Sequence, residues 1–94
     1  MKVIWGARAK RDLRELVLYI AQDSLQAAES VNERILKSAE VLSSFPRGGR
    51  IGRVHRTRER VVSNTPYILV YRISKSSISI LRVYHSARKW PKSF

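Results

Sequence analysis

Arginine side chains recur in the second half of the sequence, on segments that alternate between apolar and other residues. Arg72 and Arg82 each interrupt an otherwise apolar row, at roughly matching distances from a loop centred on residues 75–76. An antiparallel hairpin is expected to bring them near each other, with Arg58 or Arg60 approaching from the preceding segment. Each guanidinium offers a planar fork of donors, which suits a phosphate or a carboxylate. Alternatively, these arginines lay their stems over core residues and pair with carboxylates on helices.

Two other titratable side chains accompany the arginines. Glu59 is the only acid between residues 46 and 94, and we interpret it as a counter-ion that keeps Arg58 and Arg60 apart rather than as a general base. His85 stands at the end of a predicted strand, where an imidazole can exchange a proton near neutral pH. A lone histidine is, however, more often structural.

No metal or cofactor site is predicted. His55 and His85 have no cysteine and a single carboxylate near them in the sequence, which is too few ligands for a metal. The glycines at 48, 49 and 52 lack the strand–loop–helix context of a phosphate-binding loop. The basic tail contains Trp90, which can stack on a base but more often anchors a chain end to the core.

The positive charge is strongly asymmetric along the chain. Lys and Arg number 19 against 7 Asp and Glu, for a net charge of +12, and the excess lies almost wholly after residue 45. Such a distribution predicts an anionic partner for the second half: nucleic acid, an acidic protein segment or an anionic membrane. A basic surface that serves solubility alone is the alternative.

Other features of composition indicate a small cytoplasmic protein. The chain of 94 residues is expected to form one domain over 1–94, and it has no cysteine, as is common in a reducing compartment. The longest apolar stretch, residues 16–21, is too short to span a bilayer, and no secretory signal is visible.

Apolar periodicity predicts the elements that must position these side chains. Residues 3–5 indicate a short strand, and a helix then begins near Ala7 and breaks at Asp23 and Ser24, either of which can cap the next helix. A second helix is expected over residues 25–43, where Phe45–Pro46 ends it. Two helices with a tight link predict an antiparallel hairpin. The apolar stripes of the two helices comprise Ala9, Leu13, Leu16, Val17, Ile20, Leu25, Ala28, Val31, Ile35, Ala39 and Leu42.

After Gly52 the period becomes two, which predicts strands over residues 58–63, 67–73 and 78–84. On the middle strand, alternation places Leu69 and Tyr71 on one face and Ile68, Val70 and Arg72 on the other. On the last strand it places Leu81 and Val83 opposite a row of Ile78, Ile80, Arg82 and Tyr84. We expect the helices to pack on the face with Leu81 and Val83. The predicted fold class is therefore α+β, with a short N-terminal strand, a helical hairpin and an antiparallel sheet of three or four strands.

The ordered set of motifs resembles the RelE/ParE superfamily of bacterial type II toxins over essentially the whole chain. These motifs are Asp12-Leu13 and Tyr19-Ile20-Ala21 on the first helix, Phe45-Pro46, Gly49-Arg50, Thr57-Arg58-Glu59, Pro66-Tyr67-Ile68, Tyr71-Arg72-Ile73, Ile80-Leu81-Arg82-Val83, His85, Arg88 and Trp90-Pro91. The resemblance implies a toxin held inactive in a hetero-oligomer with an antitoxin whose toxin-binding segment is acidic.

Two mechanisms follow from the resemblance. RelE-like members cleave mRNA on the ribosome, whereas ParE-like members inhibit DNA gyrase without breaking bonds themselves. Ribonuclease members usually carry an arginine after the tyrosine that opens the middle strand, and here that position is Ile68, which cannot bind a phosphate. The pieces Arg58-Glu59 and Tyr71-Arg72 look more ParE-like. Whether the protein is an enzyme is left open at this point.

The resemblance and the charge pattern together define three sets of candidate residues. For target binding they are Arg82, Arg88, Lys89 and Trp90. For antitoxin binding they are Arg50, Arg53, Arg58 and Arg72. For a ribonuclease site they are Arg58, Glu59, Arg72, Arg82 and His85. A third possibility is a non-toxic protein whose basic half neutralises phosphates of nucleic acid, although neither helix has the charge of a recognition helix.

Overall fold

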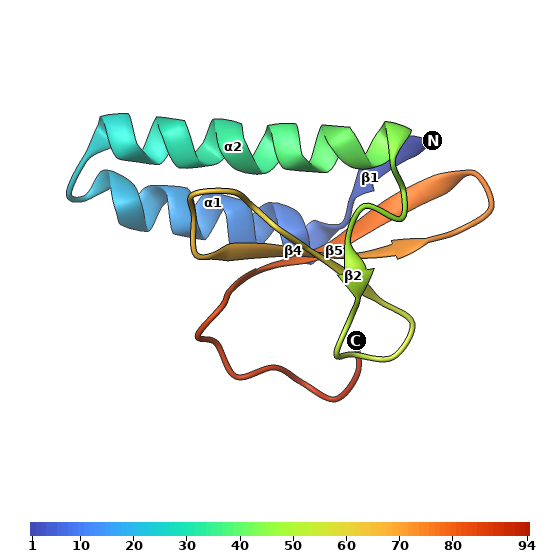
Figure 1. The fold of residues 1–94 in the computed structure, drawn as a ribbon. Helices are drawn as coiled ribbons and strands as arrows, with labels where there is room; N and C mark the ends of the chain where they lie inside the picture. The colour runs from blue at the N-terminus through green and yellow to red at the C-terminus, as the bar shows by residue number, and fades with distance from the viewer.

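The structure is a computed structural model that describes residues 1–94. Short connections join its two helices and five strands (Figure 1). The order along the chain is β1 (Lys2–Trp5), α1 (Ala7–Ala21), α2 (Leu25–Ser44), β2 (Arg50–Ile51), β3 (Arg58–Val61), β4 (Tyr67–Ile73) and β5 (Ser77–His85). The predicted α+β class is confirmed. The sheet is larger than expected, because it has five strands in the order β1-β5-β4-β3-β2.

The unexpected pairings lie at the two edges of the sheet, where β1 was predicted as a strand and β2 was not. β1 pairs with β5 in parallel, so the sheet is mixed rather than antiparallel throughout. β2 is two residues long and pairs with β3 through Arg50 and Glu59. A two-residue strand shows no alternation, and a parallel partner some 75 positions away leaves no local pattern, which explains why neither pairing was predicted.

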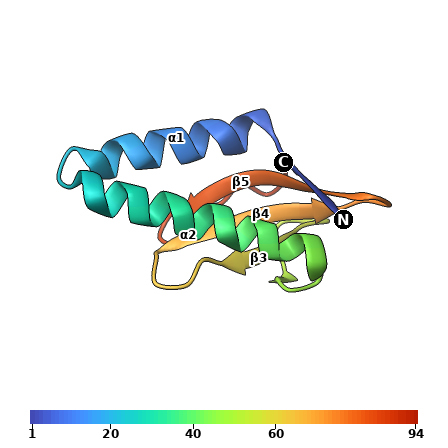
Figure 2. The ribbon, with the colours of Figure 1, turned by 90° about the horizontal axis from the view of Figure 1, so that it is seen from above.

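The helices form the expected antiparallel hairpin on one face of the sheet (Figures 1 and 2). Ser24, not Asp23, caps α2, since its hydroxyl oxygen accepts a hydrogen bond from the Ala27 amide at 3.1 Å. α2 ends at Ser44, directly before Phe45 and Pro46. The link between the helices is therefore only three residues long, 22–24, and it forces the two axes to run side by side.

The main core lies between the helical hairpin and the sheet. Its buried members are Ala9, Ile35, Ala39, Leu42, Val62, Leu69, Tyr71, Ile78, Ile80 and Val83. Leu13, Leu16 and Val31 pack against this cluster with part of their surface exposed, as the apolar stripes predicted. Val17 and Ile20 were expected in the same core and do not belong to it.

A β-bulge changes the faces of β5. Val70 pairs with Arg82 while its neighbour Tyr71 pairs with Ile80, so Leu81 has no partner on β4. The alternation predicted for this strand was therefore wrong before the bulge and right after it. Ile78 and Ile80 face the helices together with Val83, whereas Arg82 and Tyr84 face the other side. The faces predicted for β4 are confirmed, because Leu69 and Tyr71 lie in the core.

The second face of the sheet is also covered. Ile68 and Val70 on β4 are 3% and 0% exposed, and Tyr84 on β5 is 1% exposed. Figure 1 shows the loop after β2 and the C-terminal tail on the side of the sheet that the helices leave open. Arg72 ties this loop to β4, since its Nε donates to the Arg56 carbonyl at 2.9 Å. The cationic residues of these two irregular segments are Arg53, Arg56, Arg88, Lys89 and Lys92.

Candidate functional site

The tail and β5 enclose a cationic hollow of about 420 Å³, called the tail hollow here. Its centre is the buried ring of Tyr84, with the Arg88 guanidinium 4.3 Å and the Arg82 guanidinium 4.6 Å from the ring centroid. Cations over an aromatic face are attracted by its negative quadrupole. The residues around the hollow are Arg8, Arg82, Tyr84, Arg88, Lys89, Trp90, Pro91, Ser93 and Phe94. The structure thus brings together all four residues predicted for target binding.

Arg82 also pairs with a helix carboxylate, which is the alternative that the sequence offered for these arginines. Its Nε and Nη2 donate to the two carboxylate oxygens of Asp12 on α1 at 2.8 and 2.9 Å, and Asp12 also accepts from the Val83 amide at 2.9 Å. Hydrogen bonding to the Asp12 carboxylate raises the pKa of Arg82 above its usual value. The side chains are only 15% and 10% exposed. Arg82 therefore helps to hold α1 against the β5 bulge, while Arg88 and Lys89 are exposed on the tail.

Glu59 is almost completely buried and is the centre of a second cluster. Its carboxylate accepts from Arg50 Nη2 at 2.9 Å and from the Arg53 backbone amide, Nε and Nη2 at 2.7, 3.1 and 3.1 Å. The predicted partners were wrong, because Arg58 instead donates to the Gly49 carbonyl and Arg60 to the Ser38 hydroxyl. Arg50 lies on β2 and Arg53 on the loop after it, and the pairing of β2 with β3 places both beside Glu59. Strand alternation does not predict which strands pair.

The pKa of Glu59 is below its usual value, and the cause is its arginine partners. Burial by itself would raise this pKa, but hydrogen bonds from Arg53, with a smaller contribution from Arg50, outweigh it. A carboxylate whose oxygens are occupied by these donors is poorly suited to accept a proton from a substrate. Glu59 is thus a buried counter-ion, as interpreted, for a different pair of arginines.

Glu59 also connects the sheet to the C-terminal tail. The Arg53 guanidinium that it holds lies 3.8 Å from the Trp90 ring centroid. Trp90 in turn packs edge-on against Tyr84, with ring centroids 5.0 Å apart. This chain of contacts anchors Trp90, so the anchoring role considered for its side chain is the one the structure supports.

A second cationic hollow, of about 500 Å³, opens where β3 begins and β4 ends, and it is called the arginine cleft here. Its lining residues are Arg47, Ile51, Arg56, Thr57, Arg58, Arg72 and Ile73. Arg58 and Arg72 thus share one hollow, as expected, but Arg82 does not belong to it. Arg47 and Arg56 were not among the candidates, because their loops carry no strand pattern that would assign them a face.

The predicted antitoxin residues fall into two groups. Arg58 and Arg72 line the arginine cleft, whereas Arg50 and Arg53 are occupied by Glu59 and keep 55% and 45% of their side-chain surface exposed. The five candidate ribonuclease residues are also divided. Glu59 is buried, Arg82 belongs to the tail hollow, and Arg58 and Arg72 to the cleft.

His85 and Ile68 lie apart from both hollows. His85 Nδ1 accepts a hydrogen bond from the Ala87 amide at 3.0 Å, and its ring packs edge-on against Tyr67. Burial, together with the nearby Tyr19, raises the pKa of Tyr67 above its usual value. Ile68, at the position where an arginine would bind a scissile phosphate, is 3% exposed and pairs with Tyr84.

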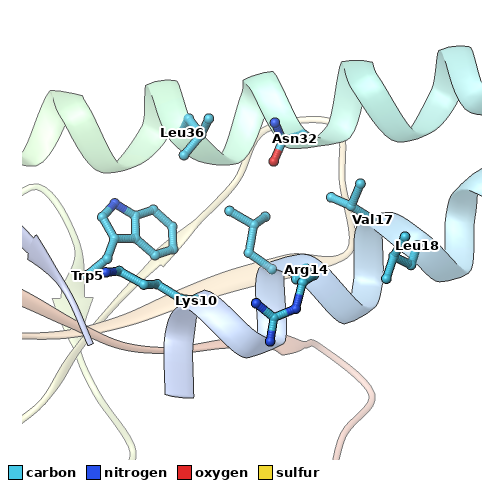
Figure 3. A pocket seen from close by; sticks show the side chains of 8 residues that line it. Trp5, Lys10, Arg14, Val17, Leu18, Asn32 and Leu36 are labelled. Atoms are coloured by element: carbon cyan, nitrogen blue, oxygen red, sulfur yellow. The ribbon is translucent and has the colours of Figure 1, made fainter. Parts of the chain in front are cut away.

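An apolar groove of about 440 Å³ lies between α1 and α2 (Figure 3). Its lining residues are Trp5, Lys10, Leu13, Arg14, Val17, Leu18, Asn32 and Leu36. Val17, predicted for the core, lines this groove instead. Leu18 and Leu36 fall outside the helical stripes, and leucines at such positions were the one sequence signal that could have revealed a second apolar surface.

No helix is long and apolar enough to cross a membrane. The structure contains no group of three or more His, Cys, Asp or Glu side chains that could hold a metal ion.

The fold and its two cationic hollows define a small basic α+β protein. A family model described as the ParE toxin of type II toxin–antitoxin systems matches residues 3–90. The chain therefore belongs to the ParE toxin family, within the RelE/ParE superfamily that its motifs resemble.

Relatives and a solved structure agree with this assignment. Y4kP of Sinorhizobium fredii is 41% identical over 97% of this chain and 94% of its own length. Toxin RelE2 of Caulobacter vibrioides is 32% identical over 93% of this chain and 97% of its own. A chain of the chromosomal ParDE toxin–antitoxin system from P. aeruginosa has the same fold, with a TM-score of 0.80 at 22% identity over 90% of this chain and 95% of that one.

Proposed function

We propose that this toxin acts in the cytoplasm as a single domain over residues 1–94 and inhibits growth by binding an essential protein, with DNA gyrase as the candidate. In this proposal it cleaves no RNA, and an acidic antitoxin neutralises it in a hetero-oligomer. The observation that carries the proposal is the division of the candidate ribonuclease residues among separate places. A nuclease needs its phosphate-binding and proton-transferring groups within hydrogen-bond reach of one substrate.

Two residues in particular argue against RNA cleavage. Ile68 is buried under the second face of the sheet, so no phosphate-binding side chain stands at that position. Glu59, the only acid of the basic half, accepts hydrogen bonds from two arginines and is not free to act as a base. Loss of one anion-stabilising donor in a catalytic site commonly lowers the rate by about a hundred- to a thousandfold.

The tail hollow is the best-supported surface for the target. Arg88 and Lys89 are exposed on its rim, and Trp90 provides partly exposed aromatic surface beside the buried ring of Tyr84. Arginine and aromatic residues are enriched where protein interfaces concentrate their binding energy. Arg82 is less accessible because Asp12 holds it.

The groove between the helices suits the apolar face of the antitoxin. Leu13, Val17 and Leu18 line it, while Lys10 and Arg14 on α1 add positive charge. An amphipathic segment with acidic flanks would bury its apolar side chains there and pair with these cations. Acidic residues beyond that segment would reach the basic half of the toxin.

Inducible expression with and without a co-expressed acidic antitoxin tests the function. We expect growth arrest without the antitoxin, relief with it, and inhibition of DNA supercoiling by purified toxin and gyrase. Arg88→Ala should weaken gyrase inhibition about tenfold, the loss of one favourable interfacial charge. Arg11→Ala on the exposed face of α1 is the matched control.

The relatives named RelE keep the ribonuclease as the second candidate. Codon-specific mRNA cleavage in a translating extract, abolished by His85→Ala, would establish that candidate and overturn the proposal. Expression without any growth defect, together with salt-sensitive binding to nucleic acid, would instead identify a non-toxic nucleic-acid-binding protein.

A further inference from the structure

We propose that a hollow between α2 and the end of β3 binds a phosphate group, either as free phosphate or as the monoester of a small molecule. The hollow has a volume of about 240 Å³ and is called the helix–strand hollow here. α2 contributes Arg34, Lys37 and Ser38 to its lining, and β3 with the residues after it contributes Arg60 and Ser63. None of these residues lines the two cationic hollows or the apolar groove described above, so the site goes beyond the proposed function.

Two elements that are distant in the sequence supply the donors of the helix–strand hollow. Its α2 residues are three or four positions apart, and side chains at such spacings lie on one face of a helix. This face is turned towards β3, because Arg60 Nε donates to the Ser38 hydroxyl oxygen at 2.9 Å. Figure 2 shows α2 along the β3 side of the sheet. Donors from the helix and from the strand therefore converge on one space.

The hollow concentrates positive charge without an acid. Three of its lining residues are cations and none is Asp or Glu. The ion pairs of the protein involve Arg50, Arg53 and Arg82, so no cation of this hollow is paired. Arg60 is half-buried, although it has no carboxylate partner. Partial burial of an unpaired charge is unfavourable, and an anion bound in the hollow would compensate it.

A buried hydroxyl in the hollow has a proton to donate. Ser38 is 8% exposed, and its oxygen accepts the hydrogen bond from Arg60. No protein acceptor receives the proton of this hydroxyl, neither a carbonyl of the preceding helical turn nor a side chain. Buried polar groups normally have all their strong donors satisfied. An oxygen of a bound phosphate would accept this proton beside the Arg60 guanidinium.

The Arg60 guanidinium is held in place before any ligand arrives. Its Nε is fixed by Ser38, and its Nη1 lies against the turn that follows α2. A Cβ at Gly48 in this turn would lie 3.2 Å from that Nη1 and 3.0 Å from the Phe45 carbonyl oxygen. The remaining donors of the fork are available to a ligand. Because the side chain is already ordered, binding costs less entropy.

A tight turn places Ser63 at the open side of the hollow. The Val62 amide donates to the Tyr67 carbonyl at 3.0 Å, and the Thr65 hydroxyl donates to the Val62 carbonyl at 2.9 Å. These bonds fix the backbone on both sides of Ser63, whose side chain is exposed. A second hydroxyl donor is thus available opposite the exposed Lys37 and Arg34.

The set of donors and the size of the hollow indicate a phosphate group. A phosphate has three terminal oxygens that accept strong hydrogen bonds, and two hydroxyls, an ammonium and guanidinium forks from two elements can serve them together. A carboxylate has only two oxygens in one plane, which a single guanidinium already matches. The volume is below the range of about 300–1,000 Å³ typical of sites that enclose a whole ligand. No aromatic ring lines the hollow to stack on a base.

An NMR titration of the full chain with inorganic phosphate tests the site, at constant ionic strength set with sodium chloride. Backbone amides of residues 34–41 and 60–64 should shift along a saturating curve. Lys37→Gln should weaken phosphate binding about tenfold, since one charge-assisted contact is lost. Ser38→Ala should weaken it about fivefold through the lost hydroxyl, while alanine preserves the helix. Arg11→Gln removes the same charge as Lys37→Gln from the exposed face of α1 and should leave the affinity nearly unchanged.

Two further probes define the ligand. Glycerol phosphate carries a phosphate monoester: binding at the same amides would assign the site to phosphorylated small molecules, and its exclusion would assign the site to free phosphate. Acetate carries a carboxylate and should bind at least about tenfold more weakly than phosphate.

Four results would overturn the proposal: no saturation with phosphate, acetate binding as tight as phosphate binding, equal losses in Lys37→Gln and Arg11→Gln, or a tighter phosphate site in the arginine cleft or the tail hollow. The toxin function is tested separately by growth arrest. Failure of that function would leave the titration and its interpretation unaffected.

Discussion

At the scale of single residues, ion pairing divides the arginines into two kinds. Arg50, Arg53 and Arg82 are committed to carboxylates of the protein itself, whereas the arginines of the cleft and Arg88 are not. Only the second kind can offer its full charge to a partner. Substituting Arg82 therefore tests the attachment of α1 as much as target binding, and Arg88 is the better choice for a functional experiment.

Glu59→Gln tests the buried counter-ion. Because the folded-state pKa of Glu59 is lowered, its stabilising contribution is present above its unfolded pKa of about 4.3 and is lost as the pH falls through the folded value. The substitution should reduce the free energy of unfolding at pH 7 by roughly 1–3 kcal/mol, since charge-assisted hydrogen bonds are lost.

Urea unfolding between pH 7 and pH 3 measures this effect. The difference between wild type and Glu59→Gln should shrink below pH 4, where protonation removes the charge from the wild type. Glu40→Gln on the exposed side of α2 is the control. A difference that stays constant with pH would show that the charge of Glu59 contributes nothing.

At the scale of elements, one bulge decides which side chains of β5 face the helices. By leaving Leu81 unpaired, it places Ile80 and Val83 on the same face although they are three positions apart. It also exposes the Val83 amide at the point where β1 has ended, and Asp12 of α1 accepts that hydrogen bond. The bulge thus joins the first helix to the last strand and aims Arg82 and Tyr84 into the tail hollow.

Ile35→Ala tests the packing of α2 on the sheet. Ile35 is 0% exposed, so truncation should leave a cavity and reduce the free energy of unfolding by roughly 2–5 kcal/mol. Leu36→Ala, one position along the same helix, is the control, because Leu36 is already 38% exposed and its loss should cost less than half as much. A change below about 0.5 kcal/mol for Ile35→Ala, the level of ordinary surface substitutions, would mean that this face is not core.

At the scale of the whole molecule, the net charge of +12 is distributed so that the two kinds of surface differ. The helices carry an apolar groove and nearly balanced charge, whereas the loops, strands and tail of the second half carry most of the net positive charge. A partner with an apolar helix and an acidic extension would match both surfaces. With this division, the apolar groove would select the partner, and the positive charge would raise the rate at which an acidic partner associates.

The salt dependence of antitoxin binding tests this division. Raising the salt concentration shortens the range of electrostatic attraction to about 10 Å at 0.1 M, so the association rate should fall steeply between 50 and 500 mM. Dissociation, governed by the apolar groove, should change much less. Stopped-flow measurement of both rates checks this, and an association rate independent of salt would assign the charge another purpose.

Local patterns in the sequence were sufficient for the helical hairpin, the faces of β4, the α+β class and the superfamily. Periodicity reports which side of an element is buried, and residues such as Ile35 and Leu69 follow it because each contributes one side chain to one face. The tail residues Arg88, Lys89 and Trp90 could likewise be grouped from sequence, since they are neighbours along the chain.

Only the tertiary structure decided which charges pair and where free charge remains. Glu59 pairs with Arg50 and Arg53 rather than with its sequence neighbours Arg58 and Arg60, because β2 and the following loop lie beside β3. Such contacts depend on distance in space rather than in sequence. The same return placed Arg47 and Arg56 beside Arg58 and Arg72. The bulge at Leu81 and the parallel pairing of β1 with β5 are also long-range, since each is set by a partner strand whose register no local period records.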